Sequence, residues 1–303
     1  MTKAVILITS ATSRNAAYAA KILLAATKED SKYTVRLGAR NPDKLEEFVA
    51  QGAEAVVLDH SKSSSIRQAF RGVDSVYMVL PTLVGGEDDL MFKSILQEAK
   101  ECGTVKHIVY LSAMDAAPPT DEFRPIHNHY ANEQAIVESG IPFTILRPTW
   151  FHENTVAYRA ESVKRTGEFA SSAGDGVWTS VAIRDIAAVA VVALRDPRQH
   201  AGKTYTLMEE ALTDGQLAEK ISKAIGKPVK HVNLSPEEHK ELLKKHYAGP
   251  KDPDEYADGL VRLDRQKRES QFSAVCPDLE QVLGRKGISL DEFIAEHANA
   301  FKD

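Results

Sequence analysis

Ala4-Val5-Ile6-Leu7-Ile8 leads directly into Thr9-Ser10-Ala11-Thr12-Ser13-Arg14-Asn15-Ala16, and an alanine-rich segment follows. The apolar run predicts a short buried strand, and the polar stretch predicts a tight loop before a helix. A loop of this kind that binds a dinucleotide carries three glycines, which allow a tight turn, close backbone approach and helix packing. Those three positions hold Ser10, Ser13 and Ala16. The stretch therefore predicts the first unit of an α/β fold and leaves phosphate binding open.

Further apolar runs alternate with amphipathic stretches through the first half of the chain. Asn41-Pro42 is a helix start, and Gly52, Gly103 and Gly140 are helix ends. Repeated strand–helix units require right-handed crossovers, which favours a doubly wound parallel sheet of the Rossmann type. The expected strands are residues 4–9, 33–38, 54–58, 75–80, 107–111 and 142–146.

The pattern loosens beyond residue 150. We expect residues 1–150 to form the nucleotide-binding core and residues 151–303 to form a smaller, substrate-covering lobe with elements that return to the sheet. Capping boxes are expected at Thr213–Gln216, Ser235–Glu238 and Ser289–Glu292. The charged stretch 236–270 is typical of solvated surface helices.

Composition narrows the class of protein. The chain has 303 residues, 43% of them hydrophobic, and a formal charge of −5. This acidic balance argues against nucleic-acid and membrane partners, and no apolar run has the length of a signal or transmembrane segment. Cys102 and Cys276 form no ligand pair, so we expect reduced thiols, no metal site and a cytoplasmic location.

The first loop has the chemistry for a phosphate even without glycine. The start of a helix offers unpaired N–H groups and a favourable dipole, and serine hydroxyls can donate to phosphate oxygens. An ordinary turn with no ligand is the alternative. The candidate cofactor residues of the loop are Thr9, Ser10, Thr12, Ser13, Arg14 and Asn15.

The end of the second strand indicates which dinucleotide would bind. An acidic residue there holds the ribose hydroxyls of NAD, whereas an arginine accommodates the 2′-phosphate of NADP. This chain has Arg40 there and no acid, and Arg14 could flank the same phosphate. The pair favours NADP(H). Asp59 after the third strand, with Leu80, Pro81 and Thr82 after the fourth, completes the candidate cofactor contacts.

Several motifs along nearly the whole chain resemble the NmrA-like family of atypical short-chain dehydrogenases/reductases. The most specific is Glu138-Ser139-Gly140-Ile141-Pro142-Phe143-Thr144-Ile145-Leu146-Arg147-Pro148, which Trp150-Phe151-His152-Glu153-Asn154 continues. The resemblance implies a Rossmann fold and an NADP(H) cofactor. The other matching stretches are Arg40–Lys44, Ala69–Asp74, His107–Ser112 and Leu290–Ile294.

Within that family the chain is most similar to the NADPH quinone reductase and triphenylmethane reductase branch. His129-Tyr130-Ala131-Asn132-Glu133 matches that branch's His-x-x-Thr-Glu pattern, with Asn in place of Thr. Isoflavone-reductase-like relatives carry a catalytic lysine at the position of His129. The resemblance therefore implies that His129 lies near nicotinamide and substrate, where an imidazole can polarise or protonate a carbonyl.

Two further residues are candidates for the chemistry. The superfamily's Tyr-x-x-x-Lys pair is not intact, because Tyr130 is followed four residues later by Gln134. Tyr130 is a candidate acid–base group in the same pocket as His129. Ser112 follows the fifth strand, where it could hold a substrate oxygen or act only as a cap.

Aromatic residues gather after the sixth strand. Trp150, Phe151 and Trp178, with Tyr158 and Phe169, could line a substrate pocket or close the core of the small lobe. The pocket interpretation favours a flat, quinone-like or conjugated carbonyl substrate.

Three functions stay open at this point. The first is an NADPH-dependent reductase of such carbonyl compounds, with hydride from the nicotinamide and a homodimer as a possible assembly. The second is a non-redox dehydratase, isomerase or cyclase, which the missing glycines favour. The third is an NADP-sensing regulator.

Overall fold

The computed structural model describes residues 3–29, 32–80, 87–114, 116, 129–246, 252–271 and 273–302. The chain forms two compact units. The first unit comprises residues 1–148, 183–207 and 278–285, and the second comprises residues 149–182, 208–277 and 286–303. The chain first leaves the first unit within two residues of the boundary expected at residue 150. Two later segments then return to it.

The first unit is built on a seven-stranded sheet in the order β10-β6-β5-β4-β1-β2-β3, and every strand pair is parallel. All six expected strands are present, and the sequence did not predict the seventh, β10. The doubly wound parallel sheet is therefore confirmed. The strands are β1 (Ala4–Ile8), β2 (Tyr33–Ala39), β3 (Glu54–Val57), β4 (Ser75–Met78), β5 (His107–Leu111), β6 (Phe143–Pro148) and β10 (Lys203–Leu207).

The order of the sheet reverses at β1, because β2 lies on one side of it and β4 on the other. The carboxyl ends of strands at such a reversal form the crevice in which α/β proteins bind ligands. The Thr9 hydroxyl, which follows β1, bonds to the backbone of Val79, which follows β4. It donates to the Val79 carbonyl at 2.7 Å and accepts from the Val79 N–H at 2.9 Å. The ends of β1 and β4 are thus held together where the first loop begins.

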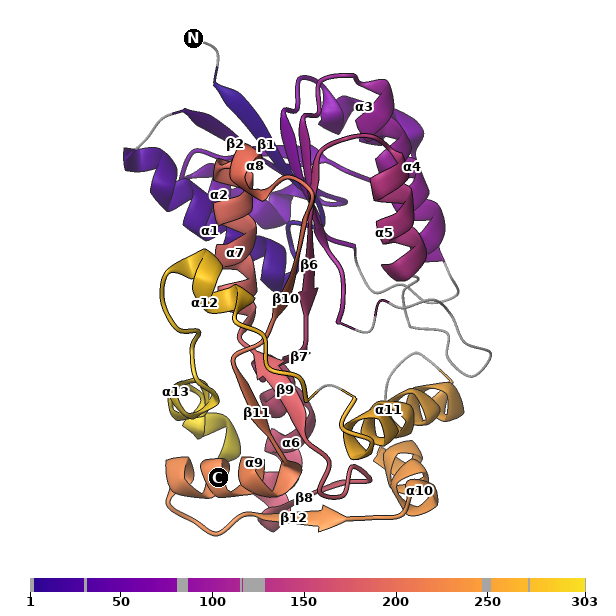
Figure 1. Ribbon diagram of the computed structural model, residues 1–303, viewed down its shortest axis with the longest axis vertical. Helices are drawn as coiled ribbons and strands as arrows, with labels where there is room; N and C mark the ends of the chain where they lie inside the picture. Colours follow the sequence, from indigo (N-terminus) through magenta and orange to yellow (C-terminus); the bar gives the residue numbers. More distant parts are fainter. Residues whose placement is uncertain are drawn as a thin grey trace. The chain divides into compact units, whose positions relative to one another are not determined.

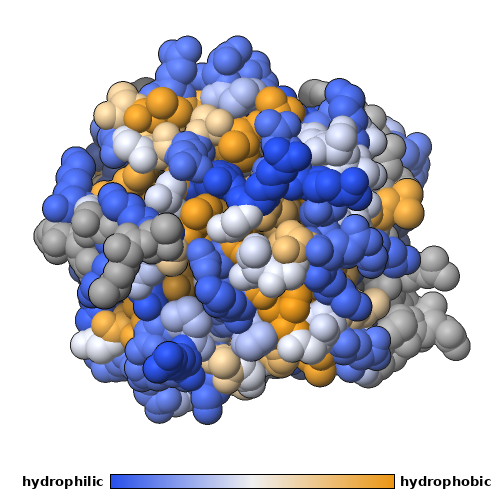
Figure 2. Space-filling view, turned by 90° about the horizontal axis from the view of Figure 1, so that it is seen from above, coloured by the Kyte–Doolittle hydropathy of each residue, from blue (hydrophilic) through white to orange (hydrophobic). Residues whose placement is uncertain are grey.

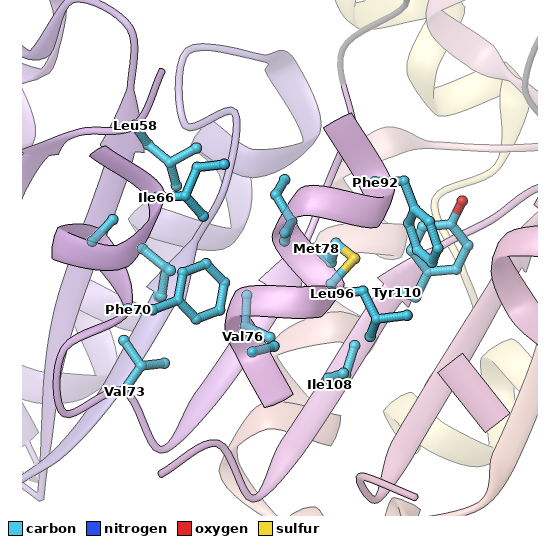
Figure 3. Packing of buried hydrophobic residues seen from close by; sticks show 14 of the residues in the cluster. Leu58, Ile66, Phe70, Val73, Val76, Met78, Phe92, Leu96, Ile108 and Tyr110 are labelled. Carbon is cyan, nitrogen blue, oxygen red and sulfur yellow. The ribbon is translucent and has the colours of Figure 1, made fainter. Parts of the chain in front are cut away.

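Helices cover both faces of the sheet (Figure 1). On one face, α3 (Ser63–Phe70), α4 (Glu87–Glu101) and α5 (His129–Glu138) bury a cluster that includes Phe70, Phe92 and Tyr110 (Figure 3). On the other, α1 (Arg14–Glu29) packs against α7 (Ile183–Arg195). Short helices complete the unit: η1 (Pro42–Leu45), α2 (Glu46–Val49), α8 (Pro197–His200) and α12 (Asp278–Leu283).

The second unit has two small sheets, β11-β9-β7 and β12-β8. Its core contains Phe169, Trp178 and Phe293. The three expected capping boxes are present, since Thr213, Ser235 and Ser289 each exchange hydrogen bonds with the residue three positions on. The strands are β7 (Trp150–Phe151), β8 (Glu168–Ser171), β9 (Trp178–Val181), β11 (Glu210–Leu212) and β12 (Lys230–Asn233), and the helices are α6 (His152–Thr166), α9 (Asp214–Ile225), α10 (Pro236–His246), α11 (Pro253–Arg268), α13 (Leu290–Glu296) and η2 (Ala298–Phe301).

The face of the molecule in Figure 2 is mostly hydrophilic, with hydrophobic side chains in small separate groups. Within the described ranges, no helix combines the length and the apolar composition needed to cross a bilayer.

Gly176 allows a close backbone approach in the second unit. A Cβ at this residue would lie 2.1 Å from the Lys267 carbonyl oxygen, whereas a Cβ at Gly259 in α11 would meet nothing within 4 Å. We expect Gly176→Ala to lower the free energy of unfolding by about 1–3 kcal/mol through overpacking. Gly259→Ala is the control and should raise it by up to about 1 kcal/mol, because alanine is the better helix former. Urea unfolding measures both, and equal effects would contradict the close contact.

Candidate functional site

Ser10 adopts the backbone conformation that the first glycine of a dinucleotide loop supplies. Its φ is +49°, in the left-handed region that favours glycine. The turn is held by hydrogen bonds from the Ala11 N–H to the Gly38 carbonyl at 3.0 Å and from the Ser13 N–H to the Ser10 carbonyl at 2.8 Å. The first turn of the loop therefore has the left-handed conformation that glycine favours, although a serine occupies the position.

The Ser10 hydroxyl is buried and has no hydrogen-bond partner among the described residues. The side-chain nitrogen of Asn15 is also buried without a hydrogen-bond partner among the described residues. The side-chain oxygen of Asn15 accepts a hydrogen bond from the Tyr77 hydroxyl at 2.5 Å. Buried polar atoms without partners are costly, and a ligand removes that cost by bonding to them. Two such atoms beside the start of a helix fit the phosphates of a dinucleotide.

Ser13 precedes α1 and caps it. Its carbonyl accepts from the Ala17 N–H at 2.9 Å, and its hydroxyl lies 3.4 Å from the Ala16 N–H. Unlike Ser10, it has no positive φ. The second glycine position thus requires no special backbone conformation here, and Ser13 instead stabilises the helix whose first N–H groups face the loop.

A cavity of about 510 Å³ opens beside this loop. Residues that follow β1, β2 and β3 line it, together with residues of α4. Arg40 is among them, is exposed, and makes no salt bridge to any residue that the structure describes. The complete lining is Ser10, Thr12, Ser13, Gly38, Ala39, Arg40, Leu58, Asp59, His60, Ser61, Leu90, Met91 and Ser94.

Asp59 and His60 give the cavity its electrostatics. Hydrogen bonds from Lys62 and Ser61 lower the pKa of Asp59 to about 2, so it is a carboxylate at neutral pH. Burial lowers the pKa of His60 to about 4, and its Nδ1 is buried without a partner among the described residues. His60 could not be singled out from the sequence, because a lone histidine after a strand carries no motif.

The other expected cofactor contacts differ in their placement. Thr9 is fully buried, and its hydroxyl is engaged by Val79. Arg14 is exposed at the start of α1 and does not line the cavity. Leu80 is half-buried at the edge of the core. Pro81 and Thr82 lie outside the described residues.

A second polar group joins Ser112, which follows β5, to Glu133 of α5 and Arg147 of β6. Ser112 donates to the buried Glu133 carboxylate at 2.5 Å. Arg147 donates hydrogen bonds to the same carboxylate from Nε, at 2.9 Å, and from Nη2. Because the Ser112 hydrogen points to Glu133, its oxygen presents only lone pairs and can accept, but not donate, a further hydrogen bond. Ser112 therefore suits a substrate O–H or N–H better than a carbonyl.

His129 begins α5 and contacts the fully buried Tyr110, whose hydroxyl lies at the edge of the hydrophobic cluster (Figure 3). The Tyr110 oxygen lies 2.9 Å from His129 Nδ1 and accepts from the Asn132 amide at 3.1 Å. The Tyr110 hydroxyl therefore contacts both His129 and Asn132, which lie one turn apart on α5.

Sequence reasoning did not identify this hydrogen-bonded chain. Tyr110 looks like any aromatic residue of a strand, and Asn132 looked like a departure from a family pattern. The spacing of His129 and Asn132 on one helix face was the available signal. Tyr130 is half-buried, and its hydroxyl makes no hydrogen bond to the described residues.

The aromatic residues of the second unit surround a lysine. The ammonium of Lys267 lies 4.6 Å from the ring centre of Trp150 and 4.5 Å from that of Trp178. Trp178 is 1% exposed, so the structure gives it a packing role, whereas Trp150 and Phe151 are half-buried. Substrate contact at these three residues stays a prediction.

Two buried carboxylates accompany Lys267. Asp214 and Asp264 each lie 3.9 Å from its Nζ. Burial acts to raise the pKa of Asp264, but His239, Lys267 and neighbouring donors outweigh it and hold the pKa below its usual range. Burial lowers the pKa of Lys267 against the opposing effect of the two carboxylates. Removal of the charge on Lys267 or on either carboxylate would destabilise the fold, because an uncompensated buried charge would remain.

Comparisons with known proteins support the expected family. A model of the NmrA-like family matches residues 2–294. The NAD(P)H azoreductase of Xenophilus azovorans is 29% identical over 276 residues, which cover 90% of this chain and 92% of that protein. An NADPH-dependent quinone oxidoreductase from Escherichia coli, solved with NADPH, has a TM-score of 0.82 and 29% identity over 97% of this chain and 98% of that one. The triphenylmethane reductase of Citrobacter sp., solved with NADP(H), has a TM-score of 0.83 and 26% identity over 97% and 99%.

The two loop serines should respond oppositely to substitution. Ser10→Gly relieves the left-handed backbone, so we expect it to raise the free energy of unfolding by about 1 kcal/mol. Ser13→Ala removes the cap of α1 and should lower it by about 1 kcal/mol. Thermal unfolding of both variants beside the parent chain measures the two signs. A loss of stability in Ser10→Gly would contradict the strained turn.

Proposed function

The chain belongs to the NmrA-like family, and from that membership we propose that it is an NADPH-dependent reductase of quinone-like or other conjugated, aromatic carbonyl compounds. Relatives named as NAD(P)H azoreductase and NADPH-dependent quinone oxidoreductase match nearly its whole length. Both names describe reductases that draw on a nicotinamide nucleotide.

The cavity beside the first loop is the observation that carries the proposal. It brings together the turn at Ser10, the start of α1 and Arg40. The turn and the helix start suit a diphosphate, and Arg40 suits a 2′-phosphate, because a guanidinium offers a planar set of donors. Leu58, Leu90 and Met91 give the cavity an apolar wall suited to a flat base.

A bound nicotinamide supplies the hydride in such a reaction. The protein then has to hold the carbonyl and deliver a proton to its oxygen. We assign that proton to the ring of His129, whose Nδ1 lies 2.9 Å from the Tyr110 hydroxyl. A general acid of this kind contributes about 10²–10⁴-fold to a rate.

Arg40 sets the choice between the two nucleotides in this proposal. Arg40→Gln should weaken NADPH binding about 10–100-fold, since it removes charge-assisted hydrogen bonds to a phosphate, and leave NADH binding unchanged. Fluorescence titration with each nucleotide measures the dissociation constants. Arg14→Gln, an exposed arginine outside the cavity, is the matched control. Equal losses for both nucleotides would show that Arg40 does not read the 2′-phosphate.

His129 is tested by kinetics with a soluble quinone. His129→Phe should lower kcat about 10²–10⁴-fold with little change in the NADPH dissociation constant. Tyr110→Phe should lower kcat less and displace the pH profile, because it removes only the group that orients the imidazole. Gln134→Ala, an exposed site on the same helix, is the control. Turnover of the quinone without a nucleotide would overturn the reductase proposal in favour of non-redox chemistry.

A further inference from the structure

The cavity beside the first loop has an apolar side next to the turn that follows β3. Leu58 and Met91 are buried there, whereas Leu90 is 68% exposed although it lines the same cavity. An exposed leucine on a cavity wall is stabilised when a flat apolar group covers it. The base of a dinucleotide is such a group, so polar side chains beside these three residues would meet the edge of the base.

Asp59 is one of these polar side chains, and its carboxylate already has partners on both oxygens. Oδ1 accepts from the Ser61 N–H at 3.1 Å and from the Ser61 hydroxyl at 2.8 Å. Oδ2 lies 2.9 Å from the Lys62 ammonium. The Lys62 N–H also donates to the Asp59 carbonyl at 3.0 Å. The carboxylate is therefore used to hold its own turn.

His60 is the next residue in that turn, and it also lines the cavity. No residue that the structure describes forms a hydrogen bond with either nitrogen of its ring, and Nδ1 is buried in that state. Burial lowers the pKa of the ring to about 4, so the ring is neutral at physiological pH. The imidazole therefore has hydrogen-bonding capacity that the described part of the protein does not use.

The position of the ring proton of His60 is not fixed by the described residues. A neutral imidazole has one N–H donor and one lone-pair acceptor, and a hydrogen bond to one nitrogen normally decides the tautomer. A carboxylate such as that of Asp59 offers only lone pairs. An acidic residue can thus only accept from a ligand, whereas the ring of His60 can either donate or accept at the same place.

This difference bears on the choice of purine base. A 6-amino purine carries an N–H donor at position 6, and a 6-oxo purine carries an acceptor there. A carboxylate bonds to the amino form and is repelled by the oxo form. An imidazole that is free to change its tautomer can accept from the amino group or donate to the oxo group.

We propose that His60, rather than Asp59, contacts the edge of the base, and that the cavity therefore binds the adenine and hypoxanthine forms of NADPH with equal affinity. This inference rests on the proposed function, for which it names a specificity-determining residue. The ring of His60 accepts from the amino group in one complex and donates to the oxo oxygen in the other.

The affinity test uses NADPH and its hypoxanthine analogue, deamino-NADPH, with the full chain at neutral pH. Fluorescence titration should give dissociation constants that agree within about threefold. His60→Phe keeps a planar ring without nitrogens and should weaken both nucleotides about 3–10-fold, the value of one hydrogen bond. Ser94→Ala is the matched control and should change neither constant, because the Ser94 hydroxyl lines the same cavity but already donates to the Leu90 carbonyl at 2.9 Å.

Nitrogen-15 NMR of the ring gives a readout that a purely structural role of His60 would not move. An imidazole nitrogen that bears the proton and one that bears the lone pair differ in chemical shift. The His60 signals are identified by their absence from His60→Phe. The two nitrogens should exchange roles between the NADPH complex and the deamino-NADPH complex.

Binding of NADPH about tenfold tighter than deamino-NADPH would assign the base to a group that only accepts, and would overturn the inference while leaving the reductase proposal intact. Unchanged affinities in His60→Phe, or one tautomer of His60 in both complexes, would overturn it too. Failure of both nucleotides to bind would overturn both proposals. Circular dichroism checks that each variant is folded. If His60→Phe does not fold, His60→Gln identifies the signals and the comparison of tautomers in the parent chain decides.

Discussion

The pair of hydrogen bonds between the Thr9 hydroxyl and the backbone of Val79 is the constraint on which the candidate cofactor site depends. It joins the carboxyl ends of β1 and β4, the strands at which the sheet changes direction. With β1 held there, the chain must turn at once to enter α1, and it does so through a left-handed residue. Serine can adopt that conformation at a cost of about 1–2 kcal/mol. The turn therefore depends on this tertiary anchor more than on the residue at the turn.

Each of the two polar groups of the first unit contains a side chain that can act only as a donor or only as an acceptor. In one, Asn132 donates to Tyr110, whose oxygen also lies 2.9 Å from His129 Nδ1. In the other, Glu133 accepts from both Ser112 and Arg147. Each group is ordered by a side chain that cannot reverse its role, since an amide nitrogen only donates and a carboxylate only accepts. Asn132 and Glu133 thereby position the side chains nearest the proposed chemistry before any ligand binds.

The sequence was sufficient to predict the sheet, because buried parallel strands are continuous apolar runs with clear helix caps between them. It was also sufficient for the family, through motifs such as the stretch 138–148. It was not sufficient for β10, whose Lys203-Thr204-Tyr205-Thr206 pattern is mostly polar, as suits an edge strand. Nor did it predict Tyr110, His60 or the surroundings of Lys267, because these depend on contacts between residues far apart in the chain. The missing glycines also gave no hint that Ser10 adopts a positive φ, the conformation that glycine favours.

The first unit is closed by a segment that comes late in the chain. Helix α7 covers one face of the sheet and β10 supplies its edge, yet both follow the excursion into the second unit. During synthesis, when chains grow at about 5–20 residues per second, strands β1–β6 emerge well before the helix that shields them. The nascent sheet thus has an uncovered apolar face and an open β6 edge for several seconds. A fragment that stops at residue 150 would lack both α7 and β10, so the first unit is complete only once residues 183–207 have been made.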